Sequence, residues 1–135
     1  MKILAGILLF VFCSCVSRDP AKNIADVDKI QIHWNNGKSV YVSKDSQVIS
    51  IFKEALTNKA KKQPVSSCAV VGYIWLMKGE ETREIVSFSL MPPDCVNFII
   101  NEGEAGPYFV YKMTYRAGRF LDDFTYQQKE HVRNN

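Results

Sequence analysis

The chain has 135 residues, of which 47% are hydrophobic and 23% are charged. This length is typical of one compact domain, and the composition argues against a disordered or low-complexity chain. Seventeen Lys and Arg residues against 14 Asp and Glu residues give a net charge of +3, which is too balanced to indicate a nucleic-acid-binding protein.

The N-terminal segment has the pattern of an export signal. Lys2 precedes an apolar run that is shorter than the roughly 20 residues needed to span a bilayer. The run ends in Phe12-Cys13-Ser14-Cys15, which resembles the lipobox of bacterial lipoproteins, with an apolar residue three positions before the Cys and a small residue directly before it. The resemblance implies a signal peptide over residues 1–14, followed by cleavage and lipidation of Cys15.

The same resemblance indicates where the protein resides. Val16 follows the lipidated Cys, whereas lipoproteins kept in the inner membrane carry Asp there, so the family's sorting tendency favours an outer-membrane lipoprotein facing the periplasm or the surface. Residues 15–27 would be the lipidated Cys and a polar tether, and residues 28–135 one domain. The alternative is a secreted or soluble periplasmic protein without lipid. In the favoured interpretation, the lipid makes the membrane the first partner.

The first expected element is a β-hairpin. Residues 28–34 and 39–42 alternate between apolar and polar, and Asn36-Gly37 is a strong turn signal between them. A two-residue turn there places Ile32 opposite Tyr41. The expected core face of this hairpin comprises Ile30, Ile32, Trp34 and Tyr41.

An amphipathic helix is expected next. With Asp45 or Ser46 as N-cap, apolar residues recur at helical spacing up to about Asn58. A basic loop of residues 59–64 follows the helix, and Pro64 prevents the helix from continuing. This loop carries the one basic cluster of the sequence, Lys59, Lys61 and Lys62. The cluster either caps the helix and solubilises the loop, or contacts anionic lipid headgroups or an acidic partner.

Two further strands predict a disulfide. Residues 68–78 are apolar on both faces, as in a central strand, and residues 83–90 return after a turn. This hairpin brings Cys95 beside Cys68, and these are the two cysteines of the mature body in an exported chain. A redox or catalytic thiol is the alternative, but neither a CxxC spacing nor a nearby His supports it.

The last part predicts two strands, residues 96–100 and 107–113, a short helix around Phe120 to Phe124, and a polar tail, residues 127–135. The order of elements predicts a single α+β domain. Its antiparallel sheet would have about five to six strands, with one amphipathic helix packed on it and a short C-terminal helix.

Patterns for catalysis are weak. His33 and His131 have no adjacent metal ligands, so neither a metal nor another cofactor is expected. The neighbouring carboxylates Glu80-Glu81 and Asp122-Asp123 diverge in strands and helices alike. Ser66-Ser67 lacks the context of an activated nucleophile. We therefore expect no enzymatic activity.

The aromatic residues give the one functional hypothesis. Tyr73 and Trp75 alternate with Ile74 and Leu76, so a single helix layer leaves one of the two sets exposed. Exposed Tyr and Trp on a rigid sheet are typical of protein-binding surfaces. The expected partner-binding residues are Tyr73, Trp75, Trp34 and Tyr108.

Three functions remain open at this level. The first is a non-enzymatic module that binds a protein partner in the envelope, such as an inhibitor or immunity protein against a hydrolase. The second is a module that binds a small ligand or cell-wall fragment in a pocket between helix and sheet. The third is an envelope hydrolase, which would need carboxylates or a His to converge in one cleft.

Overall fold

The structure, a computed structural model, describes residues 23–35, 40–57, 60–63, 68–101 and 108–133, with side chains as far as Phe124. Cys15 and the rest of the leader lie outside these residues, as do Asn36-Gly37, Lys59 and Ser66-Ser67. The side chain of His131 also lies outside the description.

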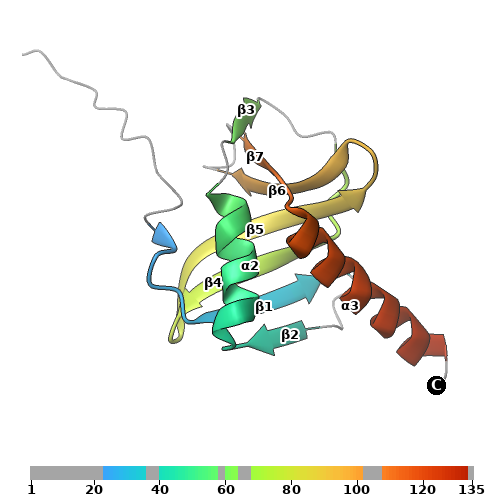
Figure 1. Cartoon of the computed structure of the whole chain (residues 1–135), viewed down its shortest axis with the longest axis horizontal. Coiled ribbons are helices and arrows are strands. Elements are labelled where there is room, and N and C mark those ends of the chain that lie inside the picture. Colours follow the sequence, from blue (N-terminus) through green and yellow to red (C-terminus); the bar gives the residue numbers. More distant parts are fainter. Residues whose placement is uncertain (1–22, 36–39, 58–59, 64–67, 102–107, 134–135) are drawn as a thin grey trace, which may run out of the picture.

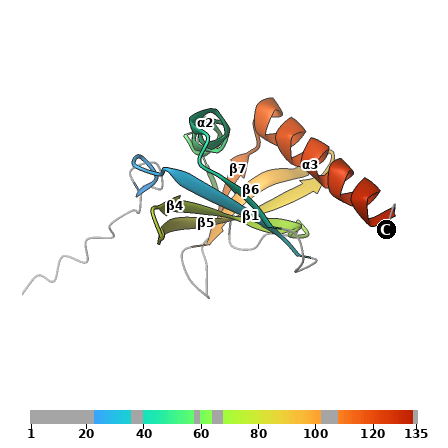
Figure 2. The same cartoon turned by 90° about the horizontal axis from the view of Figure 1, so that it is seen from below.

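Seven strands form one antiparallel sheet with the order β2-β1-β4-β5-β6-β7-β3 (Figure 1). Two helices lie on the same face of this sheet (Figure 2). The expected α+β class with an antiparallel sheet is confirmed. The elements are β1 (Lys29–Trp34), β2 (Val40–Ser43), α2 (Ser46–Leu56), β3 (Lys61–Gln63), β4 (Gly72–Lys78), β5 (Glu81–Met91), β6 (Cys95–Asn101), β7 (Tyr108–Lys112) and α3 (Tyr115–Arg133).

The strand count and the last helix differ from expectation. Residues 61–63, expected as a basic loop, form β3 and pair with β7, because Lys61 lies opposite Val110. A segment of three residues is too short to show the alternating pattern of a strand, so β3 is recognised only by its pairing with β7. The C-terminal helix has 19 residues rather than being short, since it begins at Tyr115 and continues through the expected polar tail to Arg133.

The hairpin and the first helix follow their local signals. Ile32 lies opposite Tyr41, which confirms the expected register. The Asp45 carboxylate accepts a hydrogen bond of 2.8 Å from the backbone N–H of Gln47, and thereby caps α2.

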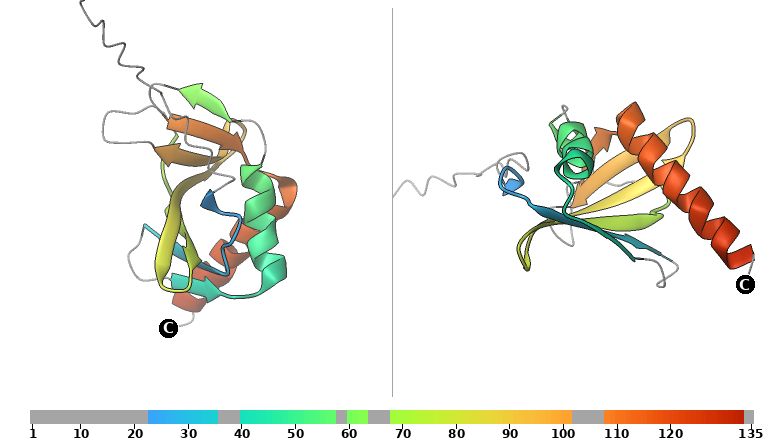
Figure 3. Two further views of the ribbon diagram at one scale, coloured as in Figure 1. Left: turned by 90° about the vertical axis from the view of Figure 1, so that its left-hand side faces the viewer. Right: turned by 60° about the horizontal axis from the view of Figure 1, so that its bottom comes forward.

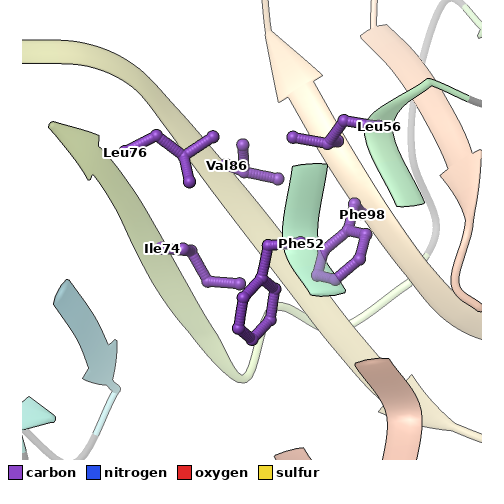
Figure 4. Close-up of a pocket in the computed structure, with 6 residues that line it drawn as sticks. All are labelled: Phe52, Leu56, Ile74, Leu76, Val86 and Phe98. Atoms are coloured by element: carbon purple, nitrogen blue, oxygen red, sulfur yellow. The ribbon is translucent and has the colours of Figure 1, made fainter. Parts of the chain in front are cut away.

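The core lies between the helices and the sheet. Phe52 and Leu56 of α2 point toward the middle strands, where Phe98 meets Phe52 in an edge-to-face contact of 6.0 Å between ring centroids (Figure 4). The side chains between α2 and the sheet leave about 0 Å³ of space that a water molecule could occupy. The residues around this closed space are Phe52, Leu56, Ile74, Leu76, Val86 and Phe98.

Strand β4 begins at Gly72, four residues later than expected. A Cβ atom on Gly72 would clash with the His33 carbonyl and the Phe88 ring, so only glycine fits between the neighbouring strands. The segment before Gly72 is tied down outside the strand pairing, because Val71 donates to the Phe88 carbonyl at 2.8 Å and its own carbonyl accepts from Asn35 at 2.9 Å.

The expected disulfide is present. Cys68 and Cys95 are joined, with their Cα atoms 5.4 Å apart. Cys95 is the first residue of β6 and pairs with Met91, so the bridge links the segment before β4 to the turn between β5 and β6. Ser89 reinforces the same junction by donating to the Ala69 carbonyl at 2.6 Å.

The folded part begins before residue 28. Ile24 and Val27, expected in the polar tether, are only 2% and 6% exposed and belong to the core. Asn23 donates to the Arg83 carbonyl at 2.9 Å, and Lys53 of α2 donates to the Ala25 carbonyl at 2.8 Å. Two apolar residues among polar ones carry no periodic signal, so only the tertiary contacts show that they are buried.

Asp28 connects this N-terminal segment to the turn between β4 and β5. Its carboxylate accepts hydrogen bonds from the Gly79 N–H at 2.9 Å and from the Lys78 ammonium at 3.0 Å. Gly79 has a φ of +57°, which suits glycine in this tight turn. The two hydrogen bonds hold the pKa of Asp28 below its usual 3.8, with the Gly79 N–H as the larger cause.

We expect the double substitution Cys68→Ala and Cys95→Ala to destabilise the fold. The bridge closes a loop over a sequence separation of 27 residues, and without it the unfolded chain regains conformational entropy. In the chain-entropy account this lowers the free energy of unfolding by about 3–4 kcal/mol. Urea denaturation of the two proteins measures the difference. A free energy of unfolding equal to that of the wild type would contradict this role.

The Asp28 interaction predicts a pH-dependent contribution to stability. Because the pKa of Asp28 is lowered on folding, its carboxylate stabilises the fold above pH 3.8, and this contribution disappears as the pH falls through the lower folded-state pKa. The difference in melting temperature between wild type and Asp28→Asn should therefore shrink as the pH is lowered below 3.8. Thermal melts across this range test it, and a constant difference would refute it.

Candidate protein-binding surface

One face of the sheet is covered by neither helix. Both α2 and α3 lie on the opposite side, as the two views of Figure 3 show. We call this side of the sheet, on which neither helix packs, the open face. Its side chains come from alternate residues of each strand, because successive side chains in a strand point to opposite faces.

A row of apolar side chains crosses the open face from the free edge of β2 to β5. Val40 and Val42 are 54% and 52% exposed, Tyr73 is 40% exposed and Ile85 is 46% exposed. Trp75 is half-buried among them and pairs with Ile85 across β4 and β5. We call this set the apolar stripe: Val40, Val42, Tyr73, Trp75 and Ile85.

Polar residues of β1 lie between the two valines of β2 and the other members of the stripe. Gln31 lies between Val42 and Trp75 in the strand pairing, and His33 lies between Val40 and Tyr73. The His33 ring packs on Trp75 with 4.7 Å between ring centroids, and one ring nitrogen lies 3.1 Å from the Gln31 side-chain oxygen. His33 thus belongs to a packed surface row.

The expected site residues divide between the two faces. Tyr73 and Trp75 lie on the open face, while Ile74 and Leu76 are buried beneath the helices. Trp34 lies on the helix-covered face, is 7% exposed and stacks on Phe124 with 4.5 Å between ring centroids. Trp34 is therefore a core residue and does not belong to the exposed surface.

Tyr108 lies with Tyr73 at a hollow in the open face. The hollow has a volume of about 460 Å³. It is lined by Cys68, Val70, Tyr73, Ile85, Ser87, Ile99, Asn101 and Tyr108. Three of the four expected partner-binding residues, Tyr73, Trp75 and Tyr108, therefore come from one face.

Three residues of the stripe, Val40, Val42 and Ile85, are not among the partner-binding residues expected from the sequence. Val40 and Val42 flank Tyr41, which lies on the core face, and Ile85 precedes the buried Val86. Alternation alone assigns each of them to the face opposite its buried neighbour. The alternation of apolar residues is visible in the sequence, but the exposed face follows only from which side of the sheet the helices cover.

Positive charge lies at the β3 and β7 end of the open face. Lys61 and Lys112 border a second hollow of about 490 Å³ together with Asn97 and with Asp94 from the turn between β5 and β6. Among the strand positions that the structure describes on this face, none carries Asp or Glu. The open face therefore combines an apolar stripe with a basic end.

Of the candidate acid groups, Glu80, Glu81 and Asp123 lie in ion pairs. Glu80 accepts from the buried Lys29 ammonium at 2.8 Å, and this hydrogen bond lowers the pKa of Glu80. Glu81 pairs with Arg83 at 2.8 Å, and exposed Asp123 lies 3.9 Å from Arg119. Within the described part of the chain, no group of three or more His, Cys, Asp or Glu residues is placed to hold a metal ion.

Comparisons with known proteins do not identify the chain. No family model matches it, and neither the curated proteins nor the solved structures contain a match. Among the residues that the structure describes, no helix combines the length and the apolar composition needed to cross a membrane.

The two tryptophans allow a direct test of the two faces. Trp34 and Trp75 are the only tryptophans in the chain. Acrylamide should quench the fluorescence of Trp34→Phe, which retains half-exposed Trp75, several-fold more strongly than that of Trp75→Phe. Equal quenching of the two variants, or stronger quenching of Trp75→Phe, would show that Trp34 is not buried as described.

Proposed function

We propose that this protein is an outer-membrane lipoprotein of a bacterial envelope and that it binds another protein through the open face of its sheet. The proposed interaction is non-enzymatic, and an inhibitor or immunity protein against an envelope hydrolase is one concrete form of it. The lipobox-like sequence ending at Cys15 supports the location, and the disulfide between Cys68 and Cys95 is compatible with an oxidising compartment.

The exposure of the apolar stripe is the observation on which this proposal rests. Tyr73 and Ile85 remain 40% and 46% exposed in the interior of a seven-stranded sheet, where their backbone is held on both sides by neighbouring strands. Exposed apolar side chains on a rigid surface favour protein binding, because a partner removes them from water at little cost in backbone entropy.

The charges on the open face indicate the chemistry of the partner. Lys61 and Lys112 lie at one end beside Asp94, and the described strand positions of this face carry no Asp or Glu, so basic side chains are in excess there. A partner that presents an apolar centre with Asp or Glu on one flank would complement both features. Such a partner would also gain in association rate from the lysines at low salt.

The two alternatives differ in their support. A ligand between helix and sheet would have to separate a core that has no room for water (Figure 4). The 460 Å³ hollow beside Tyr73 and Tyr108 is the observation that favours a small ligand or cell-wall fragment as a second candidate. A hydrolase would need convergent acid groups, whereas Glu80 and Glu81 engage in ion pairs with basic residues.

Site-specific photocrosslinking in the native envelope tests the proposal. A photoreactive phenylalanine derivative at Tyr73 should yield one discrete crosslinked protein of higher mass, because Tyr73 lies within the proposed interface. Tyr115 is the matched control, since it is also an exposed tyrosine, at 80%, but lies at the start of α3 on the other side of the sheet.

The substitution Ile85→Lys should abolish or strongly reduce the adduct formed at Tyr73. It places an ammonium group in the apolar stripe opposite Trp75, on the strand next to the one that carries Tyr73, and a bound partner would have to bury this charge. Equal crosslinking from positions 73 and 115, or no adduct from position 73, would contradict binding through the open face. Co-purifying glycan fragments without a protein adduct would favour the ligand-binding alternative.

A further inference from the structure

The outer edge of β2 is free in the described part of the chain. β2 ends the sheet on one side and pairs only with β1. Figure 2, which views the molecule from the β2 side, shows neither helix lying along this edge. The N–H and C=O groups that point outward from such an edge can pair with an approaching strand.

The two edges of the sheet differ in their protection. β3, at the far edge, has three residues, of which Lys61 and Lys62 are exposed, and a short strand with lysines resists the addition of another strand. β2 has four residues with neither lysine nor proline among them. Its Val40 and Val42 are each more than half exposed, so β2 is the edge that favours strand addition.

We propose that β2 pairs in antiparallel fashion with β2 of a second copy of this chain, which gives a two-fold symmetric dimer with one continuous sheet. The dimer uses the backbone edge of β2 together with Val40 and Val42, which also belong to the apolar stripe, whereas the protein partner proposed above would bind the interior part of the stripe at Tyr73, Trp75 and Ile85.

Symmetry restricts the register of this pairing. Two identical antiparallel edge strands are related by a two-fold axis perpendicular to the sheet, and the interface is the same on both copies. Directly opposed residues of antiparallel strands point to the same face. The register that meets both conditions and uses both valines places Tyr41 opposite the partner's Tyr41, and Val40 opposite the partner's Val42.

This register matches apolar side chains on both faces. On the open face it gathers the valines of the two copies, which are among the most exposed apolar residues of the chain. On the helix-covered face the two Tyr41 rings meet beside α3, where Tyr41 already contacts Phe120 and Phe124 at 5.7 and 5.0 Å between ring centroids. Cross-strand apolar pairs of this kind stabilise antiparallel sheets.

A second copy is therefore a suitable occupant of the edge, since Val40, Tyr41 and Val42 supply both sides of the pairing and none of them is charged. The apolar stripe of each copy begins at β2, so the dimer would also join the two stripes into one surface across the two-fold axis.

Light scattering of the full-length protein in detergent tests the dimer. The wild-type protein component should have twice the mass of one chain. Val42→Lys should raise the dimer dissociation constant by about tenfold or more, because it places an ammonium group against an apolar cross-strand neighbour at the interface. Ile85→Lys is the matched control, since it makes the same change on the same face in an interior strand, and it should leave the dimer intact.

Cysteine crosslinking tests the register and remains informative if Val42→Lys fails to fold. Val40→Cys and Val42→Cys proteins with different tags, mixed under a mild oxidant, should form a disulfide-linked pair between the two tags. The wild type, treated in the same way, controls for the native cysteines. Single-chain mass of the wild type at every concentration, equal effects of the two lysine variants, or no linked pair in the mixture would overturn the proposal.

Discussion

The packing of α2 and α3 against a single face of the sheet is the constraint on which the rest of the structure depends. Phe52 and Leu56 meet the side chains of the middle strands in a space without room for water. Because strand side chains alternate, every residue that enters this core commits its neighbours to the other face. Burial of Ile74 and Leu76 thus places Tyr73 and Trp75 outside, and burial of Val86 does the same to Ile85.

Covalent and ionic links fix the two ends of strands β4 and β5 in the middle of the sheet. At one end the disulfide between Cys68 and Cys95 joins the entry to β4 with the β5–β6 turn. At the other end Asp28 and Arg83 connect the N-terminal segment to the β4–β5 hairpin, with Arg83 contacting Asp26 at 2.9 Å. Strands β4 and β5 are therefore fixed near both ends, and these strands present Tyr73, Trp75 and Ile85. A surface held in this way loses little conformational entropy when it is covered.

The open face and the free edge of β2 have a common physical origin. The described residues form two long helices, α2 and α3, and both pack on the same face of the seven-stranded sheet. The other face and one edge consequently keep apolar side chains in contact with water. The proposed protein partner and the proposed second copy would each cover a different part of this surface, the first its interior and the second its edge.

Much of the fold could be predicted from the sequence because its signals are local. The alternating residues and the Asn36-Gly37 turn predicted that Ile32 lies opposite Tyr41. An N-cap residue followed by apolar residues at helical spacing predicted α2. Two cysteines at the open end of a predicted hairpin indicated the disulfide. Each of these signals depends on residues that are close in sequence or are linked by a single turn.

The tertiary structure alone decided which apolar residues are exposed. Sequence could say that Tyr73 and Ile74 point in opposite directions, but not which of the two directions the helices cover. The sequence analysis assigned Trp34 both to the core face of the first hairpin and to the partner-binding residues, and the structure decides for the core, where Trp34 stacks on Phe124, whereas Trp75 lies on the open face. β3 and the burial of Ile24 likewise depend on partners distant in sequence, since a three-residue strand and a lone apolar residue are stabilised only by what they contact.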